Sequence, residues 1–234
     1  MNRFLYSFFL AACMMAAYHV GSAQQQPQYA NFHSPNYSTT YPYGGPHLLY
    51  DTANRGMQFF VRCVPGASWI GTVTPSLYQP VSINRIYLFS NNEADTIIIY
   101  NLKFKLTQTA GAASFANPYT TPFYGNGFVT GMQQVFHRDT LMLTNVGSGT
   151  WIGFDLDSAY NLVSPTSYGG ILVEMTRDSF RGDGIMLKPG AAGWLGVYGN
   201  PPYDSASTTI ASISRVFGFD VDTFWNVAAS SFVS

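Results

Sequence analysis

The sequence predicts an all-β protein, an antiparallel β-sandwich of about ten strands preceded by an extended N-terminal arm. Short segments of alternating apolar residues follow one another, separated by turns rich in Gly, Pro, Asn and Ser, and such spacing is typical of sandwiches and barrels. No window shows sustained helical periodicity. Residues 24–47 contain four prolines and no Asp, Glu, Lys or Arg, so we expect an extended arm there without helix or regular strand.

The first 23 residues have the features of a secretory signal peptide. A single charge, Arg3, precedes an apolar run over residues 4–20, and the small residues Gly21 and Ala23 occupy the −3 and −1 positions of a cleavage site. A transmembrane anchor needs about 20 apolar residues, and this run is shorter. The sequence therefore predicts a secreted or cell-surface protein that is cut after Ala23 and has no transmembrane segment in its mature chain.

A second interpretation of this segment stays open. Residues Leu10–Cys13 have the form of a bacterial lipobox, in which Cys13 would carry a lipid and become the N-terminus. The apolar run continues past Cys13 to Ala17, whereas a lipoprotein usually turns polar at that point. Cleavage after Ala23 is therefore favoured, and a lipoprotein anchored at Cys13 is the alternative.

Length and charge restrict the possible partners. Removal of 23 residues from 234 leaves 211, enough for one β-sandwich domain at residues 48–234. The mature chain keeps ten basic and twelve acidic residues, and its net charge of −2 gives no reason to expect nucleic acid or an anionic membrane as partner. Charged residues are 10% of the chain, against about 25% in an average domain. Such uncharged polar surfaces are common in extracellular adhesins and assembly subunits.

The mature chain has a single cysteine, Cys63, so it cannot form an intrachain disulfide. Met57, Phe59, Val61 and Cys63 alternate along one segment and therefore share one face of a strand. We expect a buried free thiol, with a reactive or intermolecular thiol as the alternative.

The predicted strands follow one another along the domain. The clearest alternation lies in residues 101–107, where Leu102, Phe104 and Leu106 share one face and two lysines occupy the other. This pattern predicts a strand with one buried face and one solvated face. We also expect one or two short strands within residues 132–143 and an irregular stretch at 111–131. The remaining strands are expected at residues 57–63, 81–89, 96–107, 151–156, 170–176, 185–187, 193–198 and 210–221.

Five strand-forming blocks occur in a recognisable order, namely Arg55–Phe60, Ile83–Ile86, Asn101–Leu106, Trp151–Leu156 and Gly170–Met175. This order resembles that of jelly-roll β-sandwich modules in secreted proteins of Bacteroidota-type bacteria, which often stand beside adhesion or carbohydrate-binding segments. The resemblance covers roughly residues 50–222 and rests on strand order and hydrophobic pattern, without a catalytic signature. It implies a jelly-roll fold and a non-catalytic surface or binding role.

Aromatic residues in Gly- and Pro-rich loops are the best sequence clue to a ligand. The loop at residues 193–204 carries Trp194, Tyr198 and Tyr203, and Trp69 lies in a similar context. Aromatic rings can stack on the flat C–H faces of sugars, which predicts a polysaccharide as a possible partner. Packing in the core or against a loop is the alternative, because large aromatic side chains usually bury their area.

A polar turn at residues 91–95 is a candidate structural calcium site. Ca²⁺ takes oxygen ligands from loops, and this turn packs four oxygen-bearing side chains into five residues. Hairpin turns of Asn and Asp without metal are the alternative. The sequence predicts no other cofactor. The four candidate ligands are Asn91, Asn92, Glu93 and Asp95.

Catalytic patterns are weak in this chain. The Gly-x-Ser-x-Gly elbow is absent and no histidines have metal-ligand spacing. A glycoside hydrolase needs two carboxyl groups about 5–10 Å apart, and Asp155, Asp157 and Glu174 could supply them. Their alternation places them on the outer face of their strands, where we expect them to be solvated.

These observations favour a secreted or cell-surface, non-catalytic protein with a structural, adhesive or assembly role. Its expected partners are further copies of itself or other surface proteins. A carbohydrate-binding module is the first alternative, and a glycoside hydrolase-like enzyme is the second.

Overall fold

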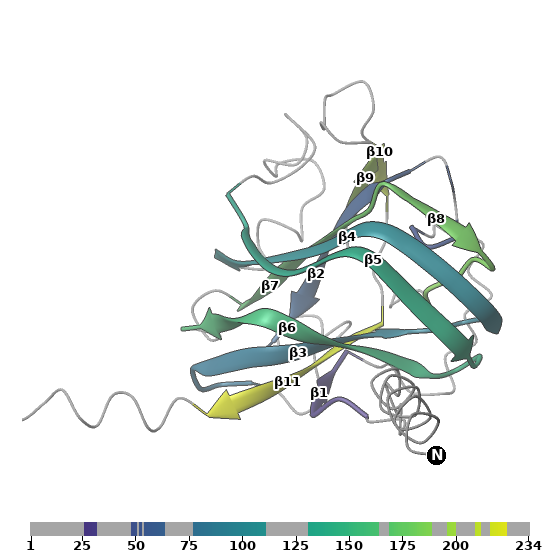
Figure 1. Cartoon of the computed structure of the whole chain (residues 1–234). Coiled ribbons are helices and arrows are strands. Elements are labelled where there is room, and N and C mark those ends of the chain that lie inside the picture. Colours follow the sequence, from purple (N-terminus) through teal and green to yellow (C-terminus); the bar gives the residue numbers. More distant parts are fainter. Residues whose placement is uncertain are drawn as a thin grey trace, which may run out of the picture.

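The computed structural model describes residues 26–31, 48–50, 52, 54–63, 77–110, 131–163, 169–188, 196–199, 209–211 and 216–223. Within these ranges the chain forms eleven strands in two antiparallel sheets and no helix. The predicted all-β sandwich is therefore confirmed (Figure 1). The jelly-roll connectivity stays a prediction.

The strands divide unequally between the sheets. The small sheet has four strands in the order β1-β11-β3-β6, and the large sheet has seven in the order β10-β9-β2-β7-β4-β5, with β8 paired to β4. The strands are β1 (Tyr29–Ala30), β2 (Gly56–Arg62), β3 (Val81–Phe89), β4 (Ala94–Ala110), β5 (Gln133–Val146), β6 (Trp151–Leu162), β7 (Gly169–Thr176), β8 (Ser179–Gly182), β9 (Gly196–Gly199), β10 (Thr209–Ala211) and β11 (Phe217–Thr223).

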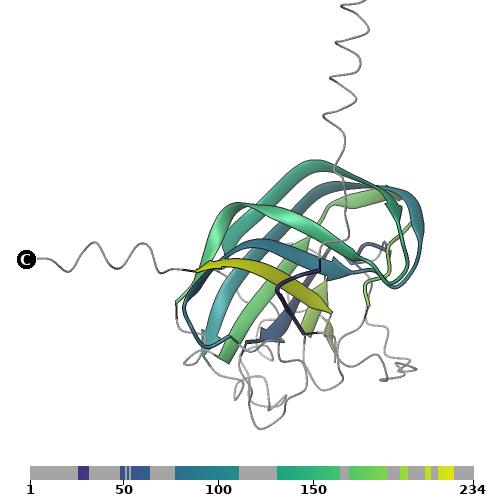
Figure 2. The ribbon, with the colours of Figure 1, turned by 90° about the horizontal axis from the view of Figure 1, so that it is seen from below.

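The two sheets lie one over the other (Figure 2), and aromatic side chains join their inner faces. The ring centroid of Phe154 on β6 lies 5.0 Å from that of Phe104 on β4 and 5.6 Å from that of Phe136 on β5. Phe59 on β2 lies 5.8 Å from Phe217 on β11. Such pairs each contribute about 0.5–1.5 kcal/mol beyond the area they bury, so they fix how the sheets pack.

The predicted inner face of β2 is confirmed. Met57, Phe59, Val61 and Cys63 are all fully buried. Burial raises the pKa of the Cys63 thiol to about 12, because a thiolate would lose its solvation there. The free cysteine is therefore a core residue with little thiolate at neutral pH.

One residue reverses the alternation within the long strand β4. Ile97 and Ile99 point into the core, and so do Leu102 and Phe104, although residues two apart should share a face. Asn101 between them has a φ of +54°, a left-handed conformation that Asn tolerates better than most residues. This one residue shifts the phase, so both halves of β4 bury their apolar side chains and Asn101 itself turns outward.

A wide bulge in β6 joins the two sheets along one side. Ile83 pairs with Tyr160 and Arg85 with Asp155, so four residues of β6 lie opposite a single residue of β3. Residues 156–159 thereby reach the neighbouring edge of β5. The contacts that join the two edges are Asp157 with His137, Ser158 with Gln134, and Ala159 with Gln133.

Several strand predictions need correction. Residues 185–187 form no strand and make a single bridge, Ser90 to Leu187, while residues 133–146 form one continuous strand. The segment 210–221 contains parts of two strands, β10 in the large sheet and β11 in the small sheet. The expectation that the arm lacks a regular strand is wrong for Tyr29–Ala30, which form β1.

Candidate functional site

Residues 26–31 of the arm lie along β11 and add an edge strand to the small sheet. Tyr29 pairs with Phe219, and their rings stack with centroids 5.4 Å apart and planes 13° apart. The backbone N–H of Asn31 donates to the Phe217 carbonyl at 3.0 Å, and the Asn31 side-chain oxygen accepts from the Phe217 N–H at 2.7 Å. Asn31 is also buried, so the end of the arm strand is firmly attached.

The start of the docked segment is held by two polar contacts and a close fit. The Gln28 N–H donates to Asp220 Oδ1, and the Gln28 side-chain oxygen accepts from the Val221 N–H, both at 2.8 Å. Pro27 lies over Gly218, where a Cβ would come within 2.4 Å of Pro27 Cγ. The missing side chain of Gly218 therefore forms a notch that accepts Pro27.

A shallow hollow of about 410 Å³ lies on the outer face of the small sheet. Its lining comes from the arm, β3, β6 and β11, and it carries three carboxylates and one guanidinium, so its net charge is negative. Carboxylate, amide and guanidinium groups can all bond to ligand hydroxyls. The lining residues are Gln28, Asn84, Arg85, Asp155, Asp220, Val221 and Asp222.

Two side chains beside the hollow lie across a glycine, Gly153. A Cβ on Gly153 would lie 2.9 Å from Arg85 Nε and 3.0 Å from Tyr87 Cε1, so these two side chains lie across it. Arg85 pairs with Asp155 at 3.2 Å, and the Tyr87 hydroxyl donates to Asp220. Burial and then the hydrogen bond to Asp220 raise the pKa of Tyr87 well above its ordinary value, so its hydroxyl stays a neutral donor.

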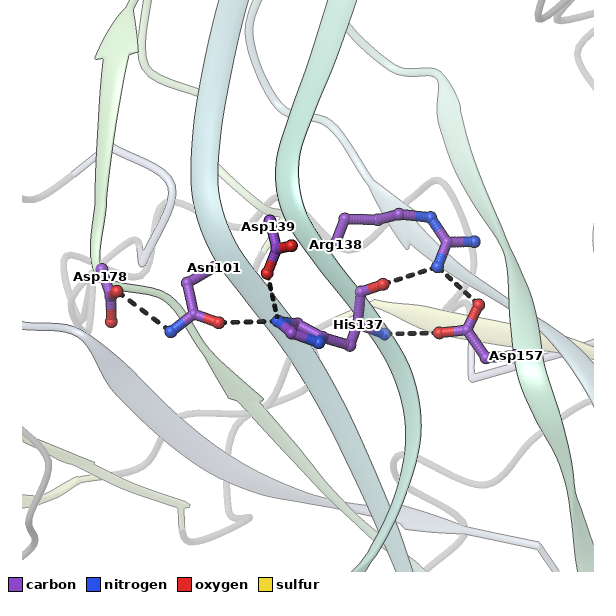
Figure 3. Close-up of polar contacts among 6 residues, drawn as sticks. All are labelled: Asn101, His137, Arg138, Asp139, Asp157 and Asp178. Atoms are coloured by element: carbon purple, nitrogen blue, oxygen red, sulfur yellow. Dashed lines mark hydrogen bonds and ion pairs between the residues drawn. The ribbon is translucent and has the colours of Figure 1, made fainter.

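A second polar group, here called the polar track, crosses the strands from the start of β8 to β6 (Figure 3). His137 Nε2 lies 2.8 Å from Asn101 Oδ1 and 3.3 Å from Asp139 Oδ1. The Asn101 amide nitrogen donates to Asp178 Oδ2 at 3.0 Å. The polar track consists of Asp178, Asn101, Asp139, His137, Arg138 and Asp157.

The other end of the polar track is an ion pair at the bulge of β6. Arg138 Nη1 donates to Asp157 Oδ1 at 2.5 Å, and the backbone N–H of His137 donates to Asp157 Oδ2 at 2.7 Å. Arg138 lowers the pKa of Asp157 below its ordinary value; burial opposes this effect, and the backbone N–H of His137 adds to the lowering. Asp157 thus satisfies a backbone donor at the edge of β5, where no further strand among the described residues pairs with it.

The aromatic ligand candidates fall mostly outside the described residues. Trp194, Tyr203 and Trp69 lie in segments that the structure does not describe. Tyr198 lies in β9, is half-buried and packs against the core cluster. Its position agrees with the packing alternative that the sequence left open, and sugar binding by the loop stays a prediction.

The candidate calcium turn is held by side-chain hydrogen bonds. The Asn92 amide donates to the Gly184 carbonyl at 2.9 Å and accepts from the Met186 N–H at 2.7 Å, so it ties the turn to residues 184–186. Among the described residues, no three His, Cys, Asp or Glu side chains gather closely enough to hold a metal. Calcium at this turn stays a prediction. The other three candidates, all exposed, are Asn91, Glu93 and Asp95.

The expected solvation of Glu174 is wrong. Glu174 is 2% exposed, accepts from Gln58 Nε2 at 2.6 Å and pairs with Lys105 at 2.7 Å. It lies in the large sheet, while Asp155 and Asp157 lie in the small sheet, and of these three only Asp155 lines the hollow. The three carboxylates considered for hydrolysis therefore do not share one pocket.

Sequence reasoning missed both polar groupings. The hollow depends on bringing residue 28 beside residues 220–222, a pairing that no local pattern shows. His137 and Asp139 did carry a signal, because residues two apart on a strand share a face. The contribution of Asn101 could not be predicted, because alternation from Ile97 and Ile99 places it in the core whereas alternation from Leu102 places it on the outer face.

Comparison with protein-family models, curated proteins and solved structures finds no match to this chain. In the part of the chain that the structure describes, no helix is long and apolar enough to cross a membrane.

Proposed function

We propose that this protein is a secreted or cell-surface, non-catalytic β-sandwich subunit, of the jelly-roll kind that its strand order resembles. Its N-terminal arm would join copies by strand exchange. The observation that carries the proposal is the docking of residues 26–31 on β11. Docking of an extended segment on a sheet edge is a recurrent mode of protein recognition, in which backbone pairing supplies affinity and pockets supply specificity. Here the notch at Gly218 accepts Pro27, and the Phe219 ring stacks on Tyr29. These two features would supply the specificity.

The same contacts can form within one chain or between two. Sixteen uncharged residues, 32–47, connect the docked segment to the domain, and a chain of that length spans at most about 55 Å. Release breaks the two-residue ladder and the hydrogen bonds of Gln28 and Asn31, and the same contacts can form again with a second copy. Release would expose the buried ring of Phe219, which the arm of a second copy can cover again.

A cysteine-pairing experiment tests exchange directly. Gln28 lies opposite Asp220 in the register that pairs Tyr29 with Phe219. Mature chains carrying Gln28→Cys are mixed with chains carrying Asp220→Cys under mild oxidation. Exchange predicts a disulfide-linked heterodimer, because opposed residues of an antiparallel pair lie within disulfide reach. The matched control pairs Gln28→Cys with Tyr78→Cys, an exposed position outside β11, and should remain unlinked.

Light scattering supplies the second measurement. Wild-type mature protein should form concentration-dependent oligomers, and deletion of residues 24–31 should return it to a monomer with its strand content retained by circular dichroism. A wild-type monomer at every concentration, together with no heterodimer in the cysteine mixture, would overturn the assembly role.

The polar hollow favours carbohydrate binding as a second candidate function. It supplies carboxylate, amide and guanidinium groups beside one another, which are the groups that bind sugar hydroxyls. In this case Asn84→Ala and Asp222→Ala should each reduce retention on a polysaccharide column. If retention is lost with Trp194→Ala instead, sugar binding belongs to the loop at residues 193–204. If no protein is retained, wild type included, the polysaccharides tested are excluded as ligands.

A further inference from the structure

Three metal-ligating atoms converge at the centre of the polar track. His137 Nε2 lies 2.8 Å from Asn101 Oδ1 and 3.3 Å from Asp139 Oδ1. Around an ion held at about 2.0–2.2 Å, neighbouring ligand atoms of a tetrahedral or octahedral shell lie about 3.0–3.5 Å apart. The measured distances are close to these polyhedral edges, so one ion could contact all three atoms after a small adjustment.

The backbone explains why these residues meet. His137 and Asp139 lie two apart on β5 and share its outer face. Tyr100 pairs with Thr140 and Leu102 with Arg138, which places Asn101 opposite Asp139. The left-handed conformation of Asn101 then turns its side chain out of the core and toward His137. Unfavourable backbone conformations of this kind concentrate at functional sites.

Neighbouring groups hold the three ligands in place. Asp178 accepts a hydrogen bond from the Asn101 amide nitrogen, which directs the amide oxygen toward His137, and Asp157 fixes the backbone N–H of His137. Outer-shell contacts of this kind orient metal ligands and raise affinity. Asp139 is 94% exposed, so an ion can reach the site from solvent.

We propose that His137, Asp139 and Asn101 bind one divalent ion of the borderline class, such as Zn²⁺, with water completing the coordination. Imidazole together with carboxylate and amide oxygens suits this class, whereas Ca²⁺ and Mg²⁺ prefer oxygen ligands alone. The ion takes the place of the proton on Nε2, and the imidazole proton then resides on Nδ1. Only His137 and Asp139 are common ligands of such ions. Lys103, which pairs with His137 in the β4–β5 register, is positively charged and repels the ion. We therefore expect a moderate affinity. The ion would link β4 to β5 at the phase shift.

Calorimetry with Zn²⁺ tests this site on the mature protein. The other two mature histidines, His33 and His47, are removed by substitution with Gln to give a background variant. That background should bind one equivalent of Zn²⁺, and adding His137→Gln should weaken binding more than about tenfold. Undiminished binding after His137→Gln would overturn the proposal, as would no binding by the background variant.

Two more substitutions test the role of Asn101 as a ligand and of Asp178 as the residue that orients it. Asn101→Gly removes the amide oxygen but keeps a residue that tolerates the left-handed conformation, so it should weaken Zn²⁺ binding about tenfold, and Asp178→Ala should weaken it by removing the group that orients the Asn101 amide. Asp222→Asn, on the small sheet, serves as the matched control and should change nothing. Undiminished binding after Asn101→Gly, with circular dichroism unchanged, would exclude Asn101 as a ligand.

Discussion

The outer faces of the two sheets differ in what covers them. In the centre of the large sheet, the outward side chains of β2 and β7 are as buried as the inward ones, with Gln58, Phe60, Leu172 and Glu174 at most 2% exposed. The outer face of the small sheet carries the polar hollow, and Asp155 and Asp222 are exposed there, although Tyr87 on the same face is buried. Strands buried on both faces read as near-continuous apolar runs, and strands with one wet face read as alternating.

This difference identifies the surface that is available for binding. A ligand or a second chain can approach the small sheet without displacing packed side chains, and both the arm and the hollow are found there. The polar residues at the centre of the outer face of the large sheet, Gln58 and Glu174, are instead internal, and Glu174 is balanced by Lys105 rather than by water. The same residue types therefore have different uses on the two sheets.

The largest expected effect comes from Phe60 on the buried outer face of the large sheet. Phe60→Ala should lower the free energy of unfolding by about 3–5 kcal/mol, because it leaves a cavity in packed surroundings. Tyr78→Ala, at a position that is more than half exposed, should change it by less than about 0.5 kcal/mol. Urea denaturation measures both. Equal effects of the two substitutions would show that this outer face is not internal.

Carboxylates on the two sheets should respond differently to loss of charge. Glu174→Gln removes the partner of Lys105 on the large sheet, and we expect a loss of about 1–3 kcal/mol. Asp155→Asn on the small sheet affects a side chain that is 80% exposed, and the midpoint of urea unfolding should hardly move. A greater loss for Asp155→Asn would reverse the comparison.

Tyr87 tests whether the hydrogen bond to Asp220, a residue that lines the hollow, stabilises the small sheet. Tyr87→Phe removes the hydrogen bond to Asp220 and should cost about 1 kcal/mol at neutral pH. Because the pKa of Tyr87 is raised in the folded state, the unfolded state loses its proton first, from about pH 10. The contribution is complete below that pH and is lost as pH rises further. Unfolding midpoints should therefore fall more steeply in alkali for the wild type than for Tyr87→Phe, and parallel curves would contradict this.

The smallest effect is expected at the bulge that joins the sheets. The pKa of Asp157 is lowered in the folded state, chiefly by Arg138, so its contribution is present above about pH 4 and is lost as pH falls through the folded pKa. Asp157→Asn should make the acid branch of the stability curve slightly shallower, by less than about 1 kcal/mol, because the pair is partly exposed. A steeper acid branch in the variant would show that the ion pair does not stabilise this junction.

Local patterns predicted the strands well where each strand keeps one phase and one wet face. The alternation of Leu102, Phe104 and Leu106, and the inner face that ends at Cys63, are both found in the structure. The run Ile97–Ile99 was predicted as strand, but the phase shift at Asn101 was not. The sequence does not show which Asn adopts a left-handed conformation within a strand.

Long-range features could not be predicted from the sequence. Glu174 was expected to be solvated because it alternates with apolar residues, but burial of a polar side chain depends on what covers the sheet, which local periodicity does not record. The hollow and the docked arm each depend on residues from both ends of the chain. Only His137 and Asp139, two residues apart on one strand, carried a local signal of the polar track.

The partners in the arm contact are far apart in the sequence, since Gln28 and Asp220 are 192 positions apart. Closing so long a loop carries an entropic cost that slows the pairing of the arm with β11. While this pairing is slow, the arm of one chain could pair with β11 of a neighbouring chain, as the proposed strand exchange requires. The crowding of copies at the moment of folding, rather than the contacts themselves, would then decide which pairing becomes trapped.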